Sequence, residues 1–394
     1  MVRLLIFSLL LSFSGVLKAQ YFDEDITVAA ELLDQYLPDL KDKRVGIVAN
    51  QTSMVGKEHL VDQLLKEGVN IRLVFAPEHG FRGTADAGEK VASQKDAKTG
   101  IRIVSLYGKN KKPKAEDMDS LDVILFDIQD VGVRFYTYIS TMHYVMQACA
   151  EKGKKFIVLD RPNPNGHYVD GPVLDPKLQS FVGMHPVPIV HGMTICEYAQ
   201  MINGEGWLGD SLKADLKVIK MKNYNHKKFY RLPIPPSPNL RTMSSIYLYP
   251  SICLFESTEI SVGRGTDKPF QIIGHPKFSK GTYEFTPTPS FGSKKPKLEG
   301  ELCKGYDLTN YGYQFARSQK KVTLHWLLEL YHETRLGKNF FKKTGFFNKL
   351  LGVYGIQQEI MAGKTEAEIR AKWTAGLEKF KLKRKKYLLY EDFE

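Results

Sequence analysis

Short apolar runs rich in Val and Ile alternate with stretches of helical periodicity between residues 40 and 205. The apolar runs cover residues 44–49, 71–75, 101–106, 121–126 and 156–159, and helical periodicity covers 58–67, 139–149 and 195–203. Continuous apolar strands that alternate with helices indicate a parallel sheet with helices packed on both faces. This alternation predicts an α/β fold, a doubly wound parallel sheet, for the first half of the chain.

A change of composition near residue 205 indicates a second domain, which a chain of 394 residues is long enough to contain. Residues 231–241 include four prolines in eleven positions, a density that excludes regular helix or a central strand. We assign residues 20–205 to the sheet domain and 206–394 to a smaller α+β domain. In the second domain we predict strands at 244–255 and 270–274, and helices at 322–335 and 365–387, the last opened by a capping-box pattern.

The first 19 residues have the pattern of a secretory signal peptide. Arg3 gives the segment a positive start, residues 4–11 form a short apolar run, and Ala19 is a small residue at a possible cleavage point. The apolar run is too short for a membrane-spanning helix, so we expect no stable membrane insertion after signal cleavage. The mature protein is therefore expected to be exported, either to the periplasm or outside the cell.

Charge, cysteine spacing and missing motifs exclude several classes of protein. The excess of 56 Lys and Arg over 44 Asp and Glu is mild and scattered, so we expect no nucleic-acid partner, although an anionic polymer would suit it. The four cysteines are about fifty residues apart, which predicts buried free thiols. The patterns GxGxxG, GxxxxGKS/T, HExxH and GxSxG are absent. We therefore expect no metal and no cofactor, which leaves carboxylate-based hydrolysis as the favoured chemistry.

Polar clusters follow three of the predicted strands, at residues 76–83, 127–136 and 160–166. The carboxyl ends of parallel strands meet at one edge of the sheet, which is where open α/β sheets bind ligands. The acids that could line one cleft at this edge are Glu78, Asp127, Asp130 and Asp160. Each cluster also fits a purely structural role, because acidic and amide side chains stabilise turns and helix starts.

Three arginines, Arg82, Arg134 and Arg161, belong to the same clusters and favour a functional interpretation. Several guanidinium groups near one sheet edge indicate an anionic ligand group, or carboxylates that they orient. In the second domain, Arg264 lies between two glycines and could present its guanidinium to an anion. Glu259 precedes that loop, for which a surface hairpin is the structural alternative.

Six motifs occur in order along the chain: PEHGFRG at 77–83, DIQDVGVRFYTY at 127–138, DRPNP at 160–164, HGMT at 191–194, PSPN at 236–239 and GRGT at 263–266. Together they resemble one family, the exo-β-N-acetylmuramidases, long catalogued only as a domain of unknown function. The resemblance runs from about residue 25 to the C-terminus. It implies a Rossmann-like first domain, a smaller second domain, and an active site in the cleft between them.

The resemblance implies that the protein releases terminal N-acetylmuramic acid from the non-reducing end of peptidoglycan fragments, the muramyl-glucosaminides. Glu78 is the family's proposed catalytic residue, and we assign it as general acid/base. The catalytic residues predicted in this way are Glu78, His79, Asp127 and Asp130. The predicted substrate-binding residues are Arg82, Arg134, Tyr136, Tyr138, Asp160, Arg161, Asn163, His191, Asn239, Glu259 and Arg264.

The chemistry of the substrate agrees with these assignments. A glycosidase needs an acid that protonates the leaving oxygen, and the muramic acid's acetamido group could replace a second carboxylate as the nucleophile. Its lactyl carboxylate calls for cationic donors, for which Arg82, Arg134 and Arg264 are the candidates. Two alternatives stay open, a non-catalytic exported two-lobed binding protein for anionic cell-wall sugars and a cell-wall esterase or amidase. The missing GxSxG pattern argues against the esterase.

Overall fold

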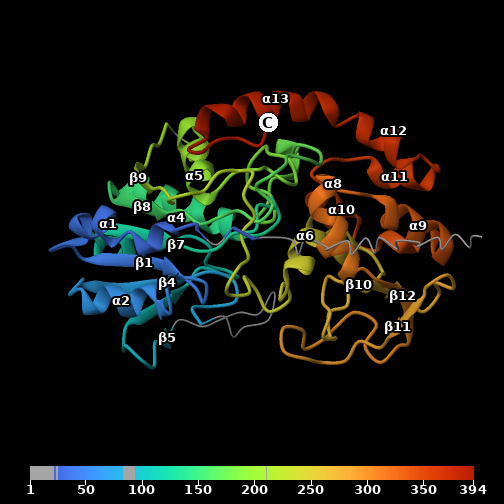
Figure 1. Ribbon diagram of the computed structural model, residues 1–394, viewed down its shortest axis with the longest axis horizontal. Coiled ribbons are helices and arrows are strands. Elements are labelled where there is room, and N and C mark those ends of the chain that lie inside the picture. Colours follow the sequence, from blue (N-terminus) through green and yellow to red (C-terminus); the bar gives the residue numbers. More distant parts are fainter. Residues whose placement is uncertain (1–21, 24, 83–93, 210) are drawn as a thin grey trace, which may run out of the picture.

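The computed structural model describes residues 22–23, 25–82, 94–209 and 211–394 (Figure 1). The predicted signal segment, residues 1–19, lies outside the described residues. Within the described ranges, no helix has the length and apolar character needed to cross a membrane.

The first domain is built on a seven-stranded sheet, in the order β5-β6-β4-β1-β7-β8-β9. All neighbouring strands are parallel except β5 and β6. The six parallel strands thus follow the order 3-2-1-4-5-6, which is the Rossmann arrangement and confirms the predicted doubly wound sheet. The strands are β1 (Val45–Ala49), β4 (Ile71–Ala76), β5 (Gln94–Lys95), β6 (Arg102–Ser105), β7 (Val123–Asp127), β8 (Lys155–Leu159) and β9 (Asp215–Ile219).

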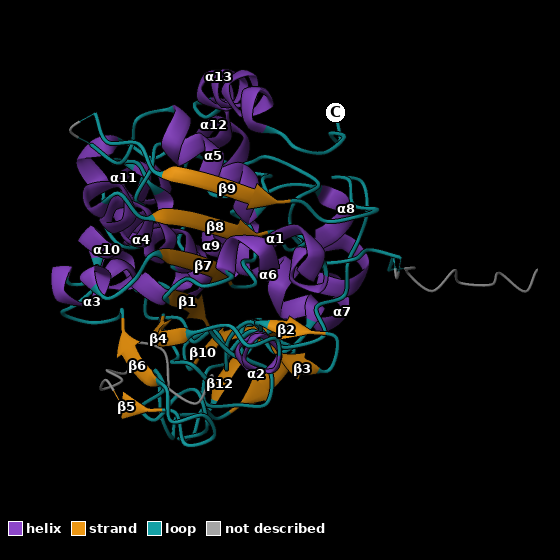
Figure 2. Ribbon diagram, turned by 90° about the vertical axis from the view of Figure 1, so that its left-hand side faces the viewer, coloured by secondary structure: helices purple, strands orange, loops and turns teal. Residues whose placement is uncertain are grey.

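Helices cover both faces of this sheet (Figure 2). Successive residues of a strand point to opposite faces, so Ile47 and Leu125 pack in one core and Val48 and Phe126 in the other. This two-sided burial explains why the strands appear in the sequence as unbroken apolar runs. The helices of this domain are α1 (Leu33–Leu40), α2 (Leu60–Lys66), α3 (Ala115–Asp119), α4 (Tyr138–Lys152) and α5 (Ile195–Gly204), and β2 (Met54–Val55) and β3 (Glu58–His59) form a small hairpin.

The sheet domain extends beyond the boundary that we predicted at residue 205. Strand β9 follows that residue and pairs with β8, so the first domain includes it. The C-terminal helix α13 (Thr374–Arg384) also returns to the first domain, where the buried Arg384 guanidinium donates to Gly192 O at 2.7 and 2.9 Å. Figure 1 shows α13 lying across the top of the molecule. A simple division of the sequence at one residue therefore does not describe the two domains.

The second domain contains a three-stranded antiparallel sheet, in the order β10-β12-β11, and a group of short helices. The predicted helix over 365–387 is two helices, and Thr365 and Glu368 form the expected capping box. The strands are β10 (Ile272–His275), β11 (Tyr283–Phe285) and β12 (Cys303–Asp307). The helices before α13 are α6 (Met243–Ile252), α7 (Thr309–Tyr311), α8 (Arg317–Gln319), α9 (His325–Thr334), α10 (Thr344–Leu351), α11 (Ile356–Met361) and α12 (Glu366–Ala371).

The strand predicted over 244–255 is wrong, because this run forms α6 and the turn of 3₁₀-helix that follows it. Every residue of α6 is buried, so the run is apolar all round and shows no helical period. A short buried helix and a buried strand cannot be told apart by such a pattern. The Thr242 hydroxyl and the Ser245 side chain form a capping box that starts the helix. The four cysteines are buried free thiols, as predicted.

The crevice between the carboxyl ends of β1 and β7, where Rossmann folds bind dinucleotides, is occupied by the chain itself. The Ser53 hydroxyl donates to Asp127 O, and Gln129 N donates to the Thr52 hydroxyl at 3.0 Å. The Gln51 amide donates to the carbonyls of Pro235 and Pro236, both at 3.1 Å, which ties the proline-rich segment to this edge. The open part of the sheet edge is therefore displaced towards β4 and the second domain.

Candidate active site

A tight turn at the end of β4 presents Glu78. The turn is closed by a hydrogen bond from Gly80 N to Pro77 O at 3.0 Å. Its third and fourth residues, His79 and Gly80, have φ values of 71° and 77°. A positive φ at the third position of a turn is usually supplied by glycine, and a non-glycine residue there costs about 1–2 kcal/mol. The surrounding structure holds the buried His79 in this conformation, which is typical of functional sites.

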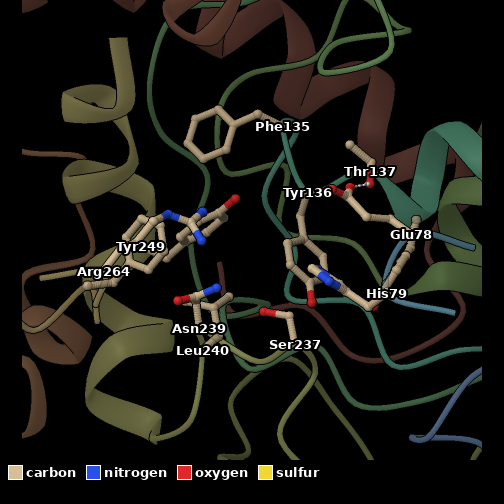
Figure 3. A pocket seen from close by; sticks show the side chains of 12 residues that line it. Glu78, His79, Phe135, Tyr136, Thr137, Ser237, Asn239, Leu240, Tyr249 and Arg264 are labelled. Atoms are coloured by element: carbon tan, nitrogen blue, oxygen red, sulfur yellow. Dashed lines mark hydrogen bonds between the residues drawn. The ribbon is translucent and has the colours of Figure 1, made fainter. Parts of the chain in front are cut away.

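The Glu78 carboxylate is held by groups from two neighbouring elements. The Thr137 hydroxyl donates to Glu78 Oε2 at 2.8 Å (Figure 3). Tyr107, which follows β6, interacts with the same carboxylate. Burial, followed by the charge of Glu78 and a hydrogen bond with it, raises the pKa of the Tyr107 phenol. The carboxyl group therefore has a defined position at the edge of the sheet.

Glu78 lines a small pocket with a cavity volume of about 70 Å³. Both domains contribute to it, through the Glu-His turn, the segment before α4, the proline-rich segment and the second domain. Figure 3 shows Glu78 and His79 on one side and Arg264 with Tyr249 on the other. The residues that line it are Glu78, His79, Phe135, Tyr136, Thr137, Tyr138, Ser237, Asn239, Leu240, Tyr249, Arg264 and Phe270.

Arg264 is held opposite Glu78 by its loop and by one carboxylate. Its neighbours Gly263 and Gly265 have φ values of 76° and 82°, and a Cβ on either would meet a backbone oxygen at 2.7 or 2.6 Å. Arg264 Nε donates to Glu256 Oε1 at 3.0 Å, and the guanidinium lies 4.9 Å from the centre of the Phe270 ring. This contact leaves the two terminal nitrogens without a carboxylate partner among the described residues. The site thus presents a positioned cation to a ligand.

The proline-rich segment forms the edge of the pocket between these two sides. The Tyr138 hydroxyl donates to Pro236 O at 3.0 Å, and the Asn239 amide nitrogen donates to Gly292 O at 2.7 Å. Prolines fix the segment's backbone, and these bonds attach it to both domains. Tyr136, Tyr138 and Asn239, three of the predicted substrate-binding residues, therefore lie at the pocket as expected.

Asp127, Arg161 and Asp160 lie at the predicted sheet edge but serve the fold. The Arg161 guanidinium binds both oxygens of Asp127 at 2.6 and 2.7 Å, and both side chains are buried. Asp160 is fully buried and accepts hydrogen bonds from the hydroxyls of Thr194 at 2.8 Å and Tyr390 at 2.6 Å. All three were expected in the cleft, and the structure instead uses them to join distant segments of the chain.

Arg134, expected to bind the ligand's anionic group, is a core residue. Its guanidinium is fully buried and donates to four backbone carbonyls, each at 2.8 Å, of Pro172, Val187, Leu350 and Leu351. Burial lowers the pKa of Arg134 to about 9. Its position in the core, outside the pocket lining, corrects the prediction that it binds a ligand anion.

Asp130, Asn163 and His191 are buried and do not line the pocket. Asp130 Oδ2 accepts from Gly132 N at 2.6 Å, and burial raises the pKa of its carboxyl to about 7. The Asn163 amide donates to Met193 O at 2.8 Å, and burial lowers the pKa of His191 to about 3. These groups are therefore part of the buried interior.

Arg82 and Glu259 are engaged elsewhere. Arg82 pairs with Asp96 at 2.9 Å and lies over the Phe81 ring. Glu259 pairs with Lys342 at 2.7 Å. Neither Arg82 nor Glu259 lines the pocket. Of the three arginines considered for an anionic group, only Arg264 faces the pocket.

Thr137, Ser237 and Tyr249 line the pocket although the sequence analysis did not select them. Thr137 and Ser237 belong to the motifs at 127–138 and 236–239, so those motifs carried a signal for them. Tyr249 lies on α6, and the incorrect strand prediction for this run removed any means of placing it. Within the described residues, no group of three or more His, Cys, Asp or Glu side chains could hold a metal ion.

Family models and a curated relative with similar descriptions match this chain. Two family models match, "Exo-beta-N-acetylmuramidase NamZ, N-terminal" over residues 45–244 and "Exo-beta-N-acetylmuramidase NamZ, C-terminal" over 247–390. The protein named peptidoglycan beta-N-acetylmuramidase NamZ from Bacillus subtilis (strain 168) is 41% identical over 384 residues, which cover 91% of this chain and 90% of that protein.

Two crystal structures of DUF1343 family proteins from Bacteroides fragilis share the fold. The structure at 1.30 Å resolution is 48% identical, with a TM-score of 0.87. The structure at 1.65 Å resolution is 29% identical, with a TM-score of 0.77. Each match covers 93% of this chain and 99% of the other.

Proposed function

Since this chain belongs to the exo-β-N-acetylmuramidase family, we propose that its pocket releases terminal N-acetylmuramic acid from the non-reducing end of peptidoglycan fragments. The observation that carries this proposal is the placement of Glu78 and Arg264 on opposite sides of one pocket (Figure 3). A carboxylic acid and a positioned guanidinium are the two groups that a muramic acid glycoside requires. Arg264 binds the lactyl carboxylate, and Glu78 reaches the glycosidic oxygen.

Glu78 acts as the proton donor for bond cleavage. Its proton moves to the glycosidic oxygen as the bond from that oxygen to the anomeric carbon breaks, and the glucosamine-bearing fragment leaves as an alcohol. The Thr137 hydroxyl and Tyr107 keep the carboxyl group in place during this transfer. In the second half of the reaction Glu78, now a carboxylate, takes a proton from a water molecule. The water oxygen bonds to the anomeric carbon as the bond between this carbon and the group that displaced the leaving alcohol breaks.

The lining of the pocket favours the sugar's own acetamido oxygen as the nucleophile. Glu78 is the only carboxylic acid among the described residues that line the pocket. A substrate-assisted reaction needs a single protein carboxyl group at the glycosidic oxygen, because the acetamido oxygen attacks the anomeric carbon. The sugar is then released with its anomeric configuration retained. Proton NMR of the first product formed would show inversion if water attacked directly.

Hydrolysis of the disaccharide muramyl-glucosamine tests the proposed function. We expect free N-acetylmuramic acid and N-acetylglucosamine as products, and no cleavage of the reversed disaccharide glucosaminyl-muramic acid. A binding protein would bind the sugar without turnover. An esterase or amidase would leave the disaccharide intact and release a peptide or an acyl group, which product masses would identify.

We also propose that residues 1–19 are removed on export and that the enzyme acts in the periplasm or outside the cell. The proposal rests on the charged start, short apolar run and small residue of this segment. N-terminal sequencing of the mature protein is expected to begin near Gln20. A mature protein that still begins with Met1 would contradict it.

A further inference from the structure

Three aromatic side chains form a band that begins beside Glu78, and we call this band the aromatic shelf (Tyr107, Phe181 and Tyr144). None of the three lines the pocket described above. Tyr107 lies next to Glu78 because the ends of β6 and β4 are joined, with Leu106 N donating to Ala76 O at 2.8 Å. The ring centres of Tyr107 and Phe181 are 6.1 Å apart. Those of Phe181 and Tyr144 are 6.3 Å apart, with planes inclined by 19°. The three rings therefore form a continuous surface that starts at the catalytic carboxyl group.

The shelf is held in a partly exposed position by the structure around it. All three rings are partly exposed, whereas most aromatic rings of this domain are buried. Ser180 and Gly183 exchange two backbone hydrogen bonds of 2.9 Å, and this tight turn presents Phe181. The Ser140 hydroxyl on α4 donates to Phe181 O at 2.7 Å. A fixed, partly exposed apolar surface at the mouth of a site is characteristic of ligand binding.

A lysine lies against this shelf. Lys111 Nζ is 4.6 Å from the centre of the Phe181 ring. Two other lysines of the same loop are neutralised, since Lys112 pairs with Glu151 at 2.6 Å and Lys114 with Glu116 at 3.3 Å. Lys111 has no such carboxylate partner among the described residues, so its charge is available to a ligand.

We infer that the aromatic shelf and Lys111 form the binding site for the leaving part of the glycan, and that the enzyme prefers fragments longer than a disaccharide. This inference rests on the proposed function, because an acid that protonates a glycosidic oxygen must lie between the two sugars that this oxygen joins. The terminal muramic acid occupies the pocket with Arg264, and the next sugars extend from Glu78 over the shelf. Their apolar C–H faces pack on the rings. The lactyl carboxylate of the next muramic acid pairs with Lys111.

The preference for longer fragments gives the first test. For wild type and for Phe181→Ala and Lys111→Met, kcat/KM is measured on the disaccharide muramyl-glucosamine and on the tetrasaccharide made of two such units. We expect the ratio of tetrasaccharide to disaccharide to fall about three- to tenfold for Phe181→Ala. For Lys111→Met we expect the same ratio of kcat/KM values to fall about two- to fivefold, and to fall less at high salt. Ratios equal to that of wild type in both variants would overturn the inference.

Two matched controls separate the shelf from general surface effects. Lys114→Met removes a charge from the same loop, and Tyr354→Ala removes an exposed ring from the second domain. Both are expected to keep the wild-type ratio. Thermal unfolding of each variant confirms that the fold is intact.

A binding measurement separates failure of this inference from failure of the proposed function. The trisaccharide glucosaminyl-muramyl-glucosamine is the leaving product of the tetrasaccharide, and calorimetry measures its binding without any turnover. Wild type is expected to bind it more tightly than Phe181→Ala and Lys111→Met. If no substrate is hydrolysed but this difference is seen, the shelf stands and the proposed function falls. If the disaccharide is hydrolysed but the trisaccharide binds equally to all variants, the shelf falls alone.

Discussion

The hydroxyl of Thr137 donates a 2.8 Å hydrogen bond to the carboxylate of Glu78, across 59 residues of sequence. Thr137 is the N-cap residue of α4, yet its side chain makes no capping bond to that helix. A threonine at this position usually caps its helix and contributes about 1 kcal/mol. Here the same hydroxyl positions the carboxyl group that we propose as the general acid, so the start of α4 contributes to the candidate active site.

Thr137→Val keeps the shape of the side chain and removes this hydrogen bond. The net value of such a bond is about 0.5–1.5 kcal/mol, so kcat on the disaccharide should fall about two- to tenfold. KM should change little, because Thr137 orients the acid and the loss appears in the transition state. Thr137→Ser retains the hydroxyl and should restore most of the activity. A rise in KM at constant kcat would assign Thr137 to sugar binding.

Glu78→Gln keeps the shape of the side chain and removes the transferable proton. We expect kcat on the disaccharide to fall at least about a hundredfold, with folding and sugar binding nearly intact. On a nitrophenyl muramide, which has a better leaving group, the fall in kcat for bond cleavage should be smaller. Glu116→Gln, on the exposed face of α3, is the matched control. Near-native turnover by Glu78→Gln would show that the catalytic assignment is wrong.

The selectivity of the pocket for muramic acid is expected to depend on Arg264. Replacing Arg264 alone would leave Glu256 unpaired, so the variant of choice is Arg264→Met with Glu256→Gln. The loss of kcat/KM on muramides, relative to glucosaminide analogues, should be about tenfold to a hundredfold, the value of a charge-assisted hydrogen bond. The exposed pair Arg44 and Asp122, changed in the same way, is the control. An equal loss on both substrates would make Arg264 a structural residue.

The left-handed backbone of His79 is expected to lower the stability of the protein. His79→Gly and His79→Ala both remove the imidazole, but only glycine adopts a φ of 71° without strain. The free energy of unfolding should therefore be about 1 kcal/mol higher for His79→Gly than for His79→Ala. Urea unfolding measures this difference. Equal stabilities of the two variants would show that the turn relaxes. If both variants lose activity and have similar kcat values, the loss is due to the missing imidazole ring and not to the backbone.

The buried carboxyl group of Asp130 is expected to make stability depend on pH. Its pKa is raised to about 7 in the folded protein, so the native state holds this proton when the unfolded state has lost it. The stabilisation is fully present below about pH 4 and is lost as the pH rises to about 7. Asp130→Asn removes this pH-dependent stabilisation. The difference in free energy of unfolding between wild type and the variant should therefore fall by up to about 4 kcal/mol as the pH rises from about 4 to about 7.

Urea unfolding at pH 4.5, 6 and 8 measures this change for wild type, Asp130→Asn and the control Asp119→Asn, an exposed acid paired with Lys152. Asp160, whose pKa is also raised to about 7 chiefly by burial, is present in all three proteins and largely cancels in the comparison. A difference that does not change with pH would show that Asp130 ionises in the folded protein as it does in water.

Local sequence was sufficient to predict five of the seven strands of the sheet and the position of Glu78 at its edge. Residues of a strand are consecutive, so an unbroken apolar run such as that of β7 identifies a strand buried on both faces. The end of a parallel strand then places the following residues at the ligand-binding edge. By this reasoning Glu78 belongs at the site, and the two glycines beside Arg264 mark a loop with a specific backbone.

The tertiary structure alone decided which polar side chains face the pocket. Arg134 and Arg264 are equally polar in the sequence, yet Arg134 is buried because four carbonyls, from residues 38 to 217 positions away, satisfy its guanidinium. Whether a buried charge finds such partners depends on segments that meet only after folding. The same holds for Thr137 and Glu78, whose hydrogen bond joins the end of one strand to the start of a later helix. The sequence by itself thus determined most of the framework and the edge at which Glu78 lies, and the packing of distant segments selected the side chains that line the pocket.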